Sequence, residues 1–140
     1  MTIRPEAPVL RVVVADDHPS VRENLRYLLT AVADLRVIGV ARTGTEALEM
    51  VRESRPDVLV LDADLPDLDG VEVARALHRE RFSTRVVLYT METEIERYSG
   101  RWNIAACVPK DAPPSDLIDA IRESVRANLR TGQPDGGQSA

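Results

Sequence analysis

Five short apolar runs alternate with amphipathic stretches along the 140-residue chain, and this alternation limits the fold more than any other feature. Each run is rich in β-branched residues and too short for a helix, so we expect five strands, at residues 9–15, 37–41, 58–61, 86–89 and 105–108. The runs are apolar almost without interruption, which is typical of parallel strands buried on both faces. Five successive strand-helix units predict a three-layer α/β domain with right-handed crossovers.

The stretches between the runs have helix start signals. A capping oxygen followed three residues later by an acid occurs at four expected starts: Ser20 with Glu23, Thr43 with Glu46, Asp69 with Glu72, and Thr93 with Glu96. The fourth helix, around residues 93–102, has the weakest pattern. A last helix is expected behind two prolines, with apolar residues at helical spacing from Leu117 to Leu129. We therefore predict an N-terminal extension at 1–8, one domain at 9–130, and a flexible tail or start of a linker at 131–140.

Composition excludes several classes of protein. The chain has 18 basic and 23 acidic side chains, a net charge of −5, so we do not expect it to bind nucleic acid by itself. No apolar run approaches the ~18 residues of a membrane span, and the N-terminus lacks the apolar segment of a secretory signal, so we expect a cytoplasmic protein without membrane contact. The single cysteine, Cys107, cannot form an internal disulfide and is interpreted as a small core residue.

Acidic residues follow two of the expected strands. Six acids and no basic residue occur from Pro56 to Ala74, and one of them, Asp62, directly follows an apolar strand, where an unpaired carboxylate is costly to bury. Asp16 and Asp17 follow the first strand. Ligands of open parallel sheets bind beyond the carboxyl ends of the strands, at the switch point in strand order. If the order is 2-1-3-4-5, these three carboxylates converge there.

Such a cluster needs a cation. Carboxylates placed together raise one another's pKa, and oxygen ligands with room for water favour Mg²⁺. Thr90 and Lys110 follow the fourth and fifth strands and should reach the same edge, and Lys110 is the only lysine in the chain. A metal and an ammonium can neutralise phosphoryl oxygens while a carboxylate attacks, so the pattern predicts a site for a phosphoryl group.

Four segments carry a resemblance to a known family: V-V-A-D-D-H-P, V-L-V-L-D-A-D-L-P-D-L-D-G, V-V-L-Y-T and P-K-D-A-P-P-S-D-L. They resemble the receiver domain of two-component response regulators, and the K-D-A-P form is similar to the LuxR/NarL subfamily. The resemblance covers about residues 9–129. It implies a flavodoxin-like (βα)5 three-layer sandwich with a five-stranded parallel sheet in the order 2-1-3-4-5.

The resemblance also implies roles for individual residues. Asp62 would be the phosphoacceptor, Thr90 and Lys110 would bind the phosphoryl oxygens, and Asp64 and Glu92 would modulate hydrolysis of the phosphoaspartate. The Mg²⁺ ligands would be Asp16, Asp17, Asp62 and the backbone carbonyl of Asp64. Pro66, Asp69 and Gly70 would shape the loop after the phosphoacceptor.

The resemblance implies that the chain is a signalling module that acts in transcription regulation. It also implies that the chain is not an enzyme that turns over a substrate. A sensor histidine kinase, or a small donor such as acetyl phosphate, would phosphorylate Asp62, and the phosphoaspartate would shift the partner-binding conformation. Two alternatives remain open. The string L-D-A-D-L is similar to a motif of haloacid-dehalogenase-type phosphatases, with Asp62 as nucleophile and Asp64 as general acid–base. A degenerate receiver would act only as an unphosphorylated interaction domain.

Three positions depart from the family pattern. Met91 replaces a small residue after Thr90 and is expected to narrow access to Asp62. Cys107 replaces the aromatic residue that swings inward on activation, which makes the switch position atypical. The segment from Ser99 to Ile104 replaces a small, glycine-containing approach to the fifth strand.

Other polar residues are given structural interpretations. We interpret His18 and His78 as structural, because neither has a second histidine at ligand spacing. Asp67 and Asp69 are interpreted as a loop and a cap residue. Arg122, Arg126 and Arg130 are interpreted as a solvated helix face with weak ion pairs, with a homodimer contact as the alternative.

Overall fold

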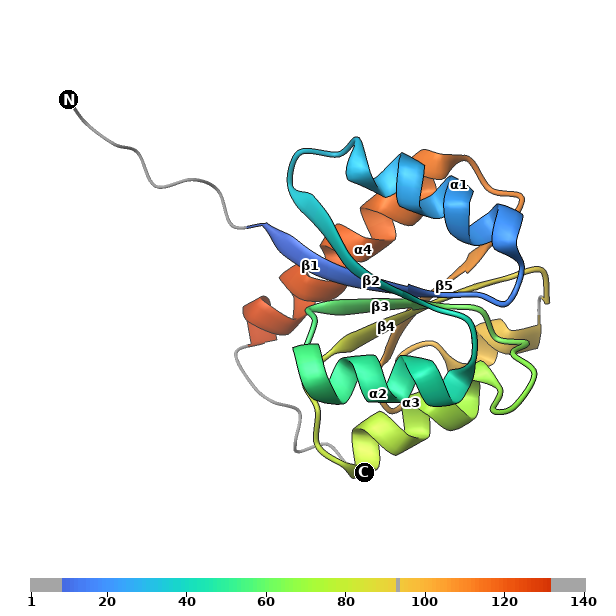
Figure 1. The fold of residues 1–140 in the computed structure, drawn as a ribbon. Coiled ribbons are helices and arrows are strands. Elements are labelled where there is room, and N and C mark those ends of the chain that lie inside the picture. The colour runs from blue at the N-terminus through green and yellow to red at the C-terminus, as the bar shows by residue number, and fades with distance from the viewer. Residues whose placement is uncertain (1–8, 93, 132–140) are drawn as a thin grey trace.

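The chain folds around a five-stranded parallel sheet with helices on both sides (Figure 1). The structure is a computed structural model, and it describes residues 9–92 and 94–131, with side chains of the last helix described as far as Arg126. The strands are β1 (Leu10–Ala15), β2 (Leu35–Ala41), β3 (Val58–Leu61), β4 (Arg85–Thr90) and β5 (Ile104–Pro109). The helices are α1 (Pro19–Thr30), α2 (Gly44–Ser54), α3 (Gly70–Arg79), the 3₁₀ turn η1 (Glu94–Tyr98) and α4 (Pro114–Thr131).

The strand order is β2-β1-β3-β4-β5, which confirms the predicted fold class and topology. Every expected strand is present, and the ends differ from the expected ones by at most two residues. β2 begins two residues early because Leu35 and Arg36 pair with Leu10 and Arg11 of β1. This order places the ends of β1 and β3 side by side at the switch point.

The core consists of two apolar clusters, one on each face of the sheet. Val12 and Val14 of β1 pack on the side of α1 and α4, whereas Val13 and Ala15 pack on the side of α2 and α3. All four side chains are buried. The uninterrupted apolar run in this strand is therefore explained by burial on both faces, as the sequence predicts.

The helix starts agree only partly with the predicted caps. Thr43 accepts a hydrogen bond from the backbone N–H of Glu46, and Asp69 and Glu72 form a full capping box at α3, so these two caps are confirmed. The cap predicted at Ser20 is wrong: α1 begins at Pro19, whose missing N–H is harmless at this position, and His18 precedes it without a side-chain cap bond. Thr93 lies outside the described residues.

The expected fourth helix is reduced to the 3₁₀ turn η1. No η1 side chain is fully buried, so this segment lacks the apolar face that stabilises a longer helix. The segment from Ser99 to Ile104 then turns back into β5, with Gly100 and Trp102 at positive φ.

A bidentate ion pair connects helix α4 to the turn before β2. Arg122 donates from Nε and Nη2 to the two carboxylate oxygens of Asp34, at 3.0 and 2.8 Å, in the turn before β2. Arg126 pairs instead with Glu123 on its own helix, as expected for a solvated face. The Arg130 and Leu129 side chains lie outside those described.

α4 ends at Thr131, one residue beyond the predicted domain limit. The predicted extension at 1–8 and the rest of the tail, 132–140, lie outside the described residues. No helix among the described residues is long and apolar enough to span a membrane.

Candidate functional site

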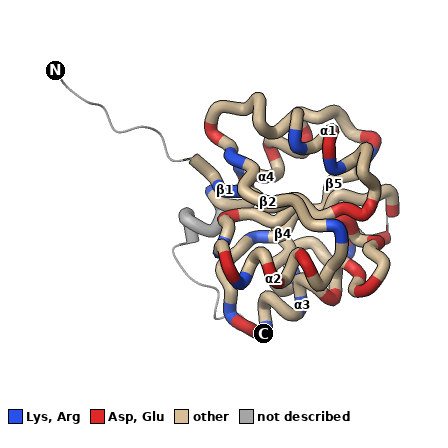
Figure 2. Tube along the Cα trace, in the orientation of Figure 1, with Lys and Arg blue, Asp and Glu red and all other residues tan. Residues whose placement is uncertain are grey.

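Three carboxylates converge beyond the ends of β1 and β3, as predicted. Carboxylate oxygens of Asp16, Asp17 and Asp62, together with His18 Nδ1, all lie within 4.8 Å of one another. The backbone N–H of Asp62 donates to the carbonyl of Ala15 at 3.0 Å, which fixes the end of β3 against the end of β1. Acidic segments gather at this end of the sheet in Figure 2.

Two of these carboxylates are almost fully buried. Asp16 is 1% exposed and Asp62 is 3% exposed, whereas Asp17 is exposed. Asp16 Oδ2 has no hydrogen-bond partner of good geometry, although the Lys110 ammonium lies against it. Among the described residues, this buried oxygen is therefore balanced by the Lys110 charge and by no well-formed hydrogen bond.

Lys110 joins the two buried carboxylates. Its Nζ lies 2.8 Å from Asp16 Oδ2 and 3.2 Å from Asp62 Oδ2, and its side chain is only 16% exposed. The loop after β5 is held in place because the backbone N–H of Lys110 donates to the carbonyl of Thr90 at 3.0 Å. The only lysine of the chain therefore lies at the predicted position, with its charge directed into the acidic cluster.

Burial and charge act in opposite directions on these groups. Burial raises the pKa of Asp62, and the neighbouring Asp16 carboxylate adds to the effect, so the pKa lies above its ordinary value. Burial also acts to raise the pKa of Asp16, but the contact with the Lys110 ammonium and the hydrogen bonds from His18 outweigh it and hold that pKa below its ordinary value. For Lys110 itself, burial acts to lower the pKa, and contacts with Asp16 and Asp62 raise it overall.

His18 contacts the acidic cluster from the solvent side. Its Nδ1 lies 3.0 Å from Asp16 Oδ1 and 3.1 Å from Asp17 Oδ1, and its backbone N–H also donates to Asp16 Oδ1 at 3.0 Å. The hydrogen bond to Asp16 and the nearby charges raise the pKa of the imidazole. The purely structural interpretation of His18 from the sequence is therefore incomplete, because this side chain is part of the cluster.

The loop after Asp62 is held at both ends. Asp62 Oδ1 accepts the backbone N–H of Asp64 at 3.0 Å, which fixes the start of the loop. At its far end, a Cβ on Gly70 would lie 2.8 Å from Ala63 Cα and 3.0 Å from the Asp62 carbonyl oxygen, so only glycine fits. Asp64 itself is exposed.

Asp67 links this loop to α2. Its carboxylate accepts the Thr45 hydroxyl and the backbone N–H groups of Gly44, Thr45 and Leu68. These donors hold the pKa of Asp67 far below its ordinary value. Asp67 is thus a loop residue, as interpreted, but its contact with a distant helix N-terminus had no signal in the local sequence.

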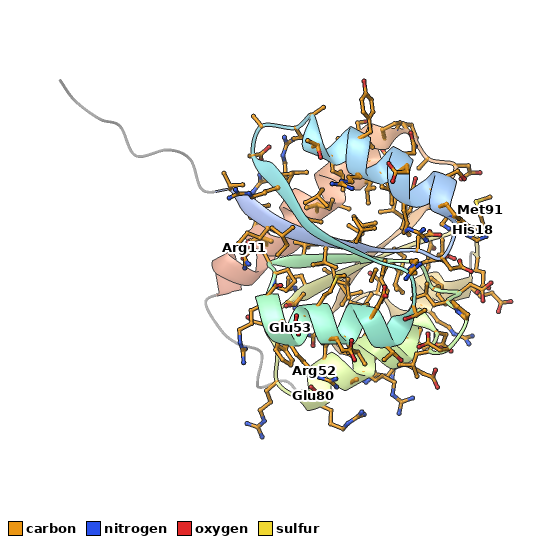
Figure 3. The ribbon with its side chains drawn as sticks, in the orientation of Figure 1. Arg11, His18, Arg52, Glu53, Glu80 and Met91 are labelled. Carbon is orange, nitrogen blue, oxygen red and sulfur yellow. The ribbon has the colours of Figure 1, made fainter. Side chains whose placement is uncertain are left out.

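The remaining predicted site residues lie around the same edge. Thr90 is buried at the end of β4, and its Oγ1 accepts the backbone N–H of Glu92 at 3.1 Å. Met91 is 62% exposed, and Figure 3 shows Met91 and His18 at this end of the molecule, opposite Arg11 and Glu53. Glu92 is also exposed.

Cys107 lies half-buried in β5. Its thiol donates to the carbonyl of Ile95 at 3.5 Å, and burial raises the pKa of Cys107 to about 11. A thiol with this pKa stays protonated at neutral pH and is a weak nucleophile. The side chain packs against the core cluster on the α2 and α3 face of the sheet, as Tyr98 and Trp102 also do, and this agrees with its interpretation as a core residue.

A comparison with family models decides the family. The model described as the response regulator receiver domain matches residues 12–122, which is most of the chain. The chain belongs to this family. It is a receiver domain of a two-component response regulator, and its acidic cluster occupies the carboxyl edge of the receiver sheet.

Individual relatives agree with this assignment. The receiver is 36% identical over 119 residues to the uncharacterized transcriptional regulatory protein YxjL of Bacillus subtilis, covering 84% of this chain and 55% of that protein. It is 32% identical over 124 residues to the probable transcriptional regulatory protein NarL of Mycobacterium tuberculosis, covering 87% and 57% respectively. The chain thus spans little more than half the length of these curated relatives.

A solved structure gives the same result. The signal receiver domain of the putative response regulator NarL from Mycobacterium tuberculosis superposes with a TM-score of 0.80 at 32% identity, covering 86% of this receiver and 98% of that chain. The relatives' names include transcriptional regulators of the NarL type, which agrees with the subfamily indicated by the K-D-A-P segment.

The residues fit a hard divalent cation. Three carboxylates against one ammonium leave an excess of negative charge, which a divalent cation would offset. Oxygen donors beside an exposed carboxylate, Asp17, suit Mg²⁺, which keeps several of its waters.

Proposed function

We propose that Asp62 of this receiver accepts a phosphoryl group in a Mg²⁺-dependent reaction. The observation that supports this most strongly is the buried Asp62 carboxylate, which shares the Lys110 ammonium with Asp16. An ion pair made only for stability would not need three carboxylates around one cation, because the third adds repulsion. A site that recruits a metal and a phosphoryl group does need them.

In the proposed reaction the Asp62 carboxylate attacks the phosphorus atom of the donor. A new O–P bond forms, and the P–N bond to the donor histidine, or the P–O bond of acetyl phosphate, breaks with its electron pair leaving on the donor. Asp16, Asp17, Asp62 and the Asp64 carbonyl would hold Mg²⁺, whose charge stabilises the phosphoryl oxygens. Lys110 and the Thr90 hydroxyl would bind the remaining oxygens.

A sensor histidine kinase is the proposed donor, and acetyl phosphate a small substitute. We propose a signalling role without turnover of a substrate: the phosphoaspartate shifts the receiver toward a partner-binding conformation. Asp64 and Glu92 are the proposed modulators of its lifetime, because both are exposed beside the site. The domain limits at 9–130, with flanking segments on either side, and a cytoplasmic location are proposals of the same standing.

The test is incubation with Mg²⁺ and acetyl phosphate followed by intact-mass spectrometry. We expect one phosphoryl group per chain, loss of the mass gain when Mg²⁺ is chelated, and no gain in Asp62→Asn. Lack of any mass gain would favour the unphosphorylated interaction domain. Release of many equivalents of phosphate from a phosphomonoester would favour the phosphatase alternative.

The position of Met91 leads to a prediction about the rate at which acetyl phosphate phosphorylates Asp62. Because its exposed side chain directly follows Thr90, we expect Met91→Ala to widen access to Asp62 and speed phosphorylation by acetyl phosphate. The rate of mass gain measures this, with Tyr27→Ala as a control for an exposed side chain on α1. An unchanged rate in Met91→Ala would remove the steric argument.

A further inference from the structure

The imidazole of His18 is positioned as a metal ligand would be. The side chain is 62% exposed, yet its Nδ1 is directed at the cluster, 3.0 Å from Asp16 Oδ1 and 3.1 Å from Asp17 Oδ1. The contact with Asp16 is a hydrogen bond, and it holds the imidazole nitrogen beside two carboxylates that are themselves candidate metal ligands. Its place directly before α1, with Pro19 as the first helical residue, fixes the backbone from which it reaches inward.

The spacing of these atoms matches the coordination shell of a small cation. Metal–oxygen and metal–nitrogen bonds of about 2.1 Å at right angles place neighbouring ligand atoms about 3.0 Å apart. The two contacts of His18 Nδ1 have this length, and the contact with Asp16 is a hydrogen bond that a metal ion would replace. One ion at the face of the cluster could therefore bind both carboxylates and the imidazole with little rearrangement.

The buried lysine leaves this face of the cluster available. Lys110 contacts the Oδ2 atoms of Asp16 and Asp62, whereas His18 contacts the Oδ1 atom of Asp16. The two side chains thus contact different oxygens of the same carboxylate. An ion bound on the His18 side would not displace Lys110 from the phosphoryl-binding position.

We propose that His18 Nδ1 is a ligand of the metal site, so that this receiver binds imidazole-preferring divalent ions such as Co²⁺, Ni²⁺ and Zn²⁺ more tightly than Mg²⁺. The inference rests on the metal site of the proposed function and adds a nitrogen donor to its oxygen ligands. Nitrogen donors favour transition metals over Mg²⁺, which prefers oxygen.

The test compares Co²⁺ and Mg²⁺ affinities by calorimetry in the wild type, His18→Gln and His78→Gln. His78 is the other histidine of the chain and lies on α3, hydrogen-bonded to Asn103. We expect His18→Gln to lose Co²⁺ affinity by about tenfold or more, a size seen even for partners of metal ligands, with much less change for Mg²⁺. His78→Gln should match the wild type.

A second measurement detects the bond directly. In ¹⁵N-labelled protein, one equivalent of Zn²⁺ should shift the His18 Nδ1 resonance and leave the His78 ring unchanged. Equal Co²⁺ affinity in the wild type and His18→Gln, or a Mg²⁺ affinity that rises on this substitution, would overturn the role of His18 as a ligand. If the wild type bound neither Co²⁺ nor Mg²⁺, the metal site of the proposed function would itself be refuted. This outcome can be told apart from failure of the His18 inference alone, in which the wild type still binds both ions.

Discussion

At the scale of single residues, the Lys110 ammonium offsets the repulsion between the neighbouring carboxylates of Asp16 and Asp62. The sequence predicted Asp16, Asp62 and Lys110 at one edge because each directly follows an apolar strand, and parallel strands end on the same side. It could not predict which carboxylate oxygens Lys110 contacts, or that His18 turns toward Asp16, because rotamers depend on tertiary contacts and not on chain order.

This balance gives a prediction for Lys110→Met. Without the ammonium, the buried Asp16 and Asp62 carboxylates lose their shared partner, and we expect a loss of about 1–3 kcal/mol in unfolding free energy at pH 7. The pKa of Asp62 is already raised in the folded state, so its ionised form opposes folding above the pKa of the unfolded chain. The loss should therefore be smaller at pH 5 than at pH 7, because a lower pH favours the protonated form of Asp62.

Urea unfolding of the wild type and Lys110→Met at both pH values measures the effect. Arg52→Met is the matched control, because it removes a cation from the exposed ion pair with Glu80. The pKa of Glu80 is lowered in the folded state, so the ionised carboxylate stabilises the fold above its unfolded pKa. This stabilisation is lost only at more acidic pH, and the effect of Arg52→Met on unfolding free energy should be the same at pH 7 and pH 5. The same loss for Lys110→Met at both pH values would contradict the account.

At the scale of elements, local signals predicted the helices wherever the neighbouring residues determine the start. Thr43 and Asp69 cap their helices because each bond closes within a single turn. The prediction failed at Ser20, where Pro19 already begins α1, and around residues 94–98, where little apolar surface is available to support a longer helix. The loop from Asp62 to Gly70 was only partly predictable, because Asp67 bonds to α2, 22 and 23 residues away.

Gly70 tests how tightly this loop is fitted to the site. We expect Gly70→Ala to destabilise the fold by about 1–3 kcal/mol, because the new methyl group would press on the backbone of Ala63 and Asp62, which cannot yield as a side chain can. Mg²⁺ affinity should fall in the same variant, since the Asp64 carbonyl, a proposed metal ligand, belongs to the displaced loop.

Gly39→Ala is the control for Gly70→Ala. There the new methyl group would meet the Met50 sulfur at 3.0 Å, and a flexible methionine can move aside. Urea unfolding and Mg²⁺ calorimetry of both variants measure the difference. If Gly70→Ala bound Mg²⁺ as tightly as Gly39→Ala, the loop would not position the metal ligands.

At the scale of the whole molecule, the fold brings together residues that are far apart in the sequence. Asp16, Asp62 and Lys110 span most of the chain, and only the order β2-β1-β3-β4-β5 places the ends of β1 and β3 next to each other. The net charge of −5, at first only an argument against nucleic acid, reflects in part the acidic edge of the sheet. The strand pattern predicted a parallel sheet because both of its faces are buried, whereas the strand order was expected from the resemblance to receiver domains.

The central claim, that Asp62 carries the phosphoryl group, is tested most directly by mapping the modified residue. The protein is phosphorylated with acetyl phosphate and Mg²⁺ and treated with borohydride, which reduces an acyl phosphate to an alcohol, and its peptides are then sequenced by mass spectrometry. We expect the reduced residue at position 62 in the wild type and in Asp64→Asn, and none in Asp62→Asn. A reduced residue at 16, 17 or 64, or its persistence in Asp62→Asn, would contradict the account.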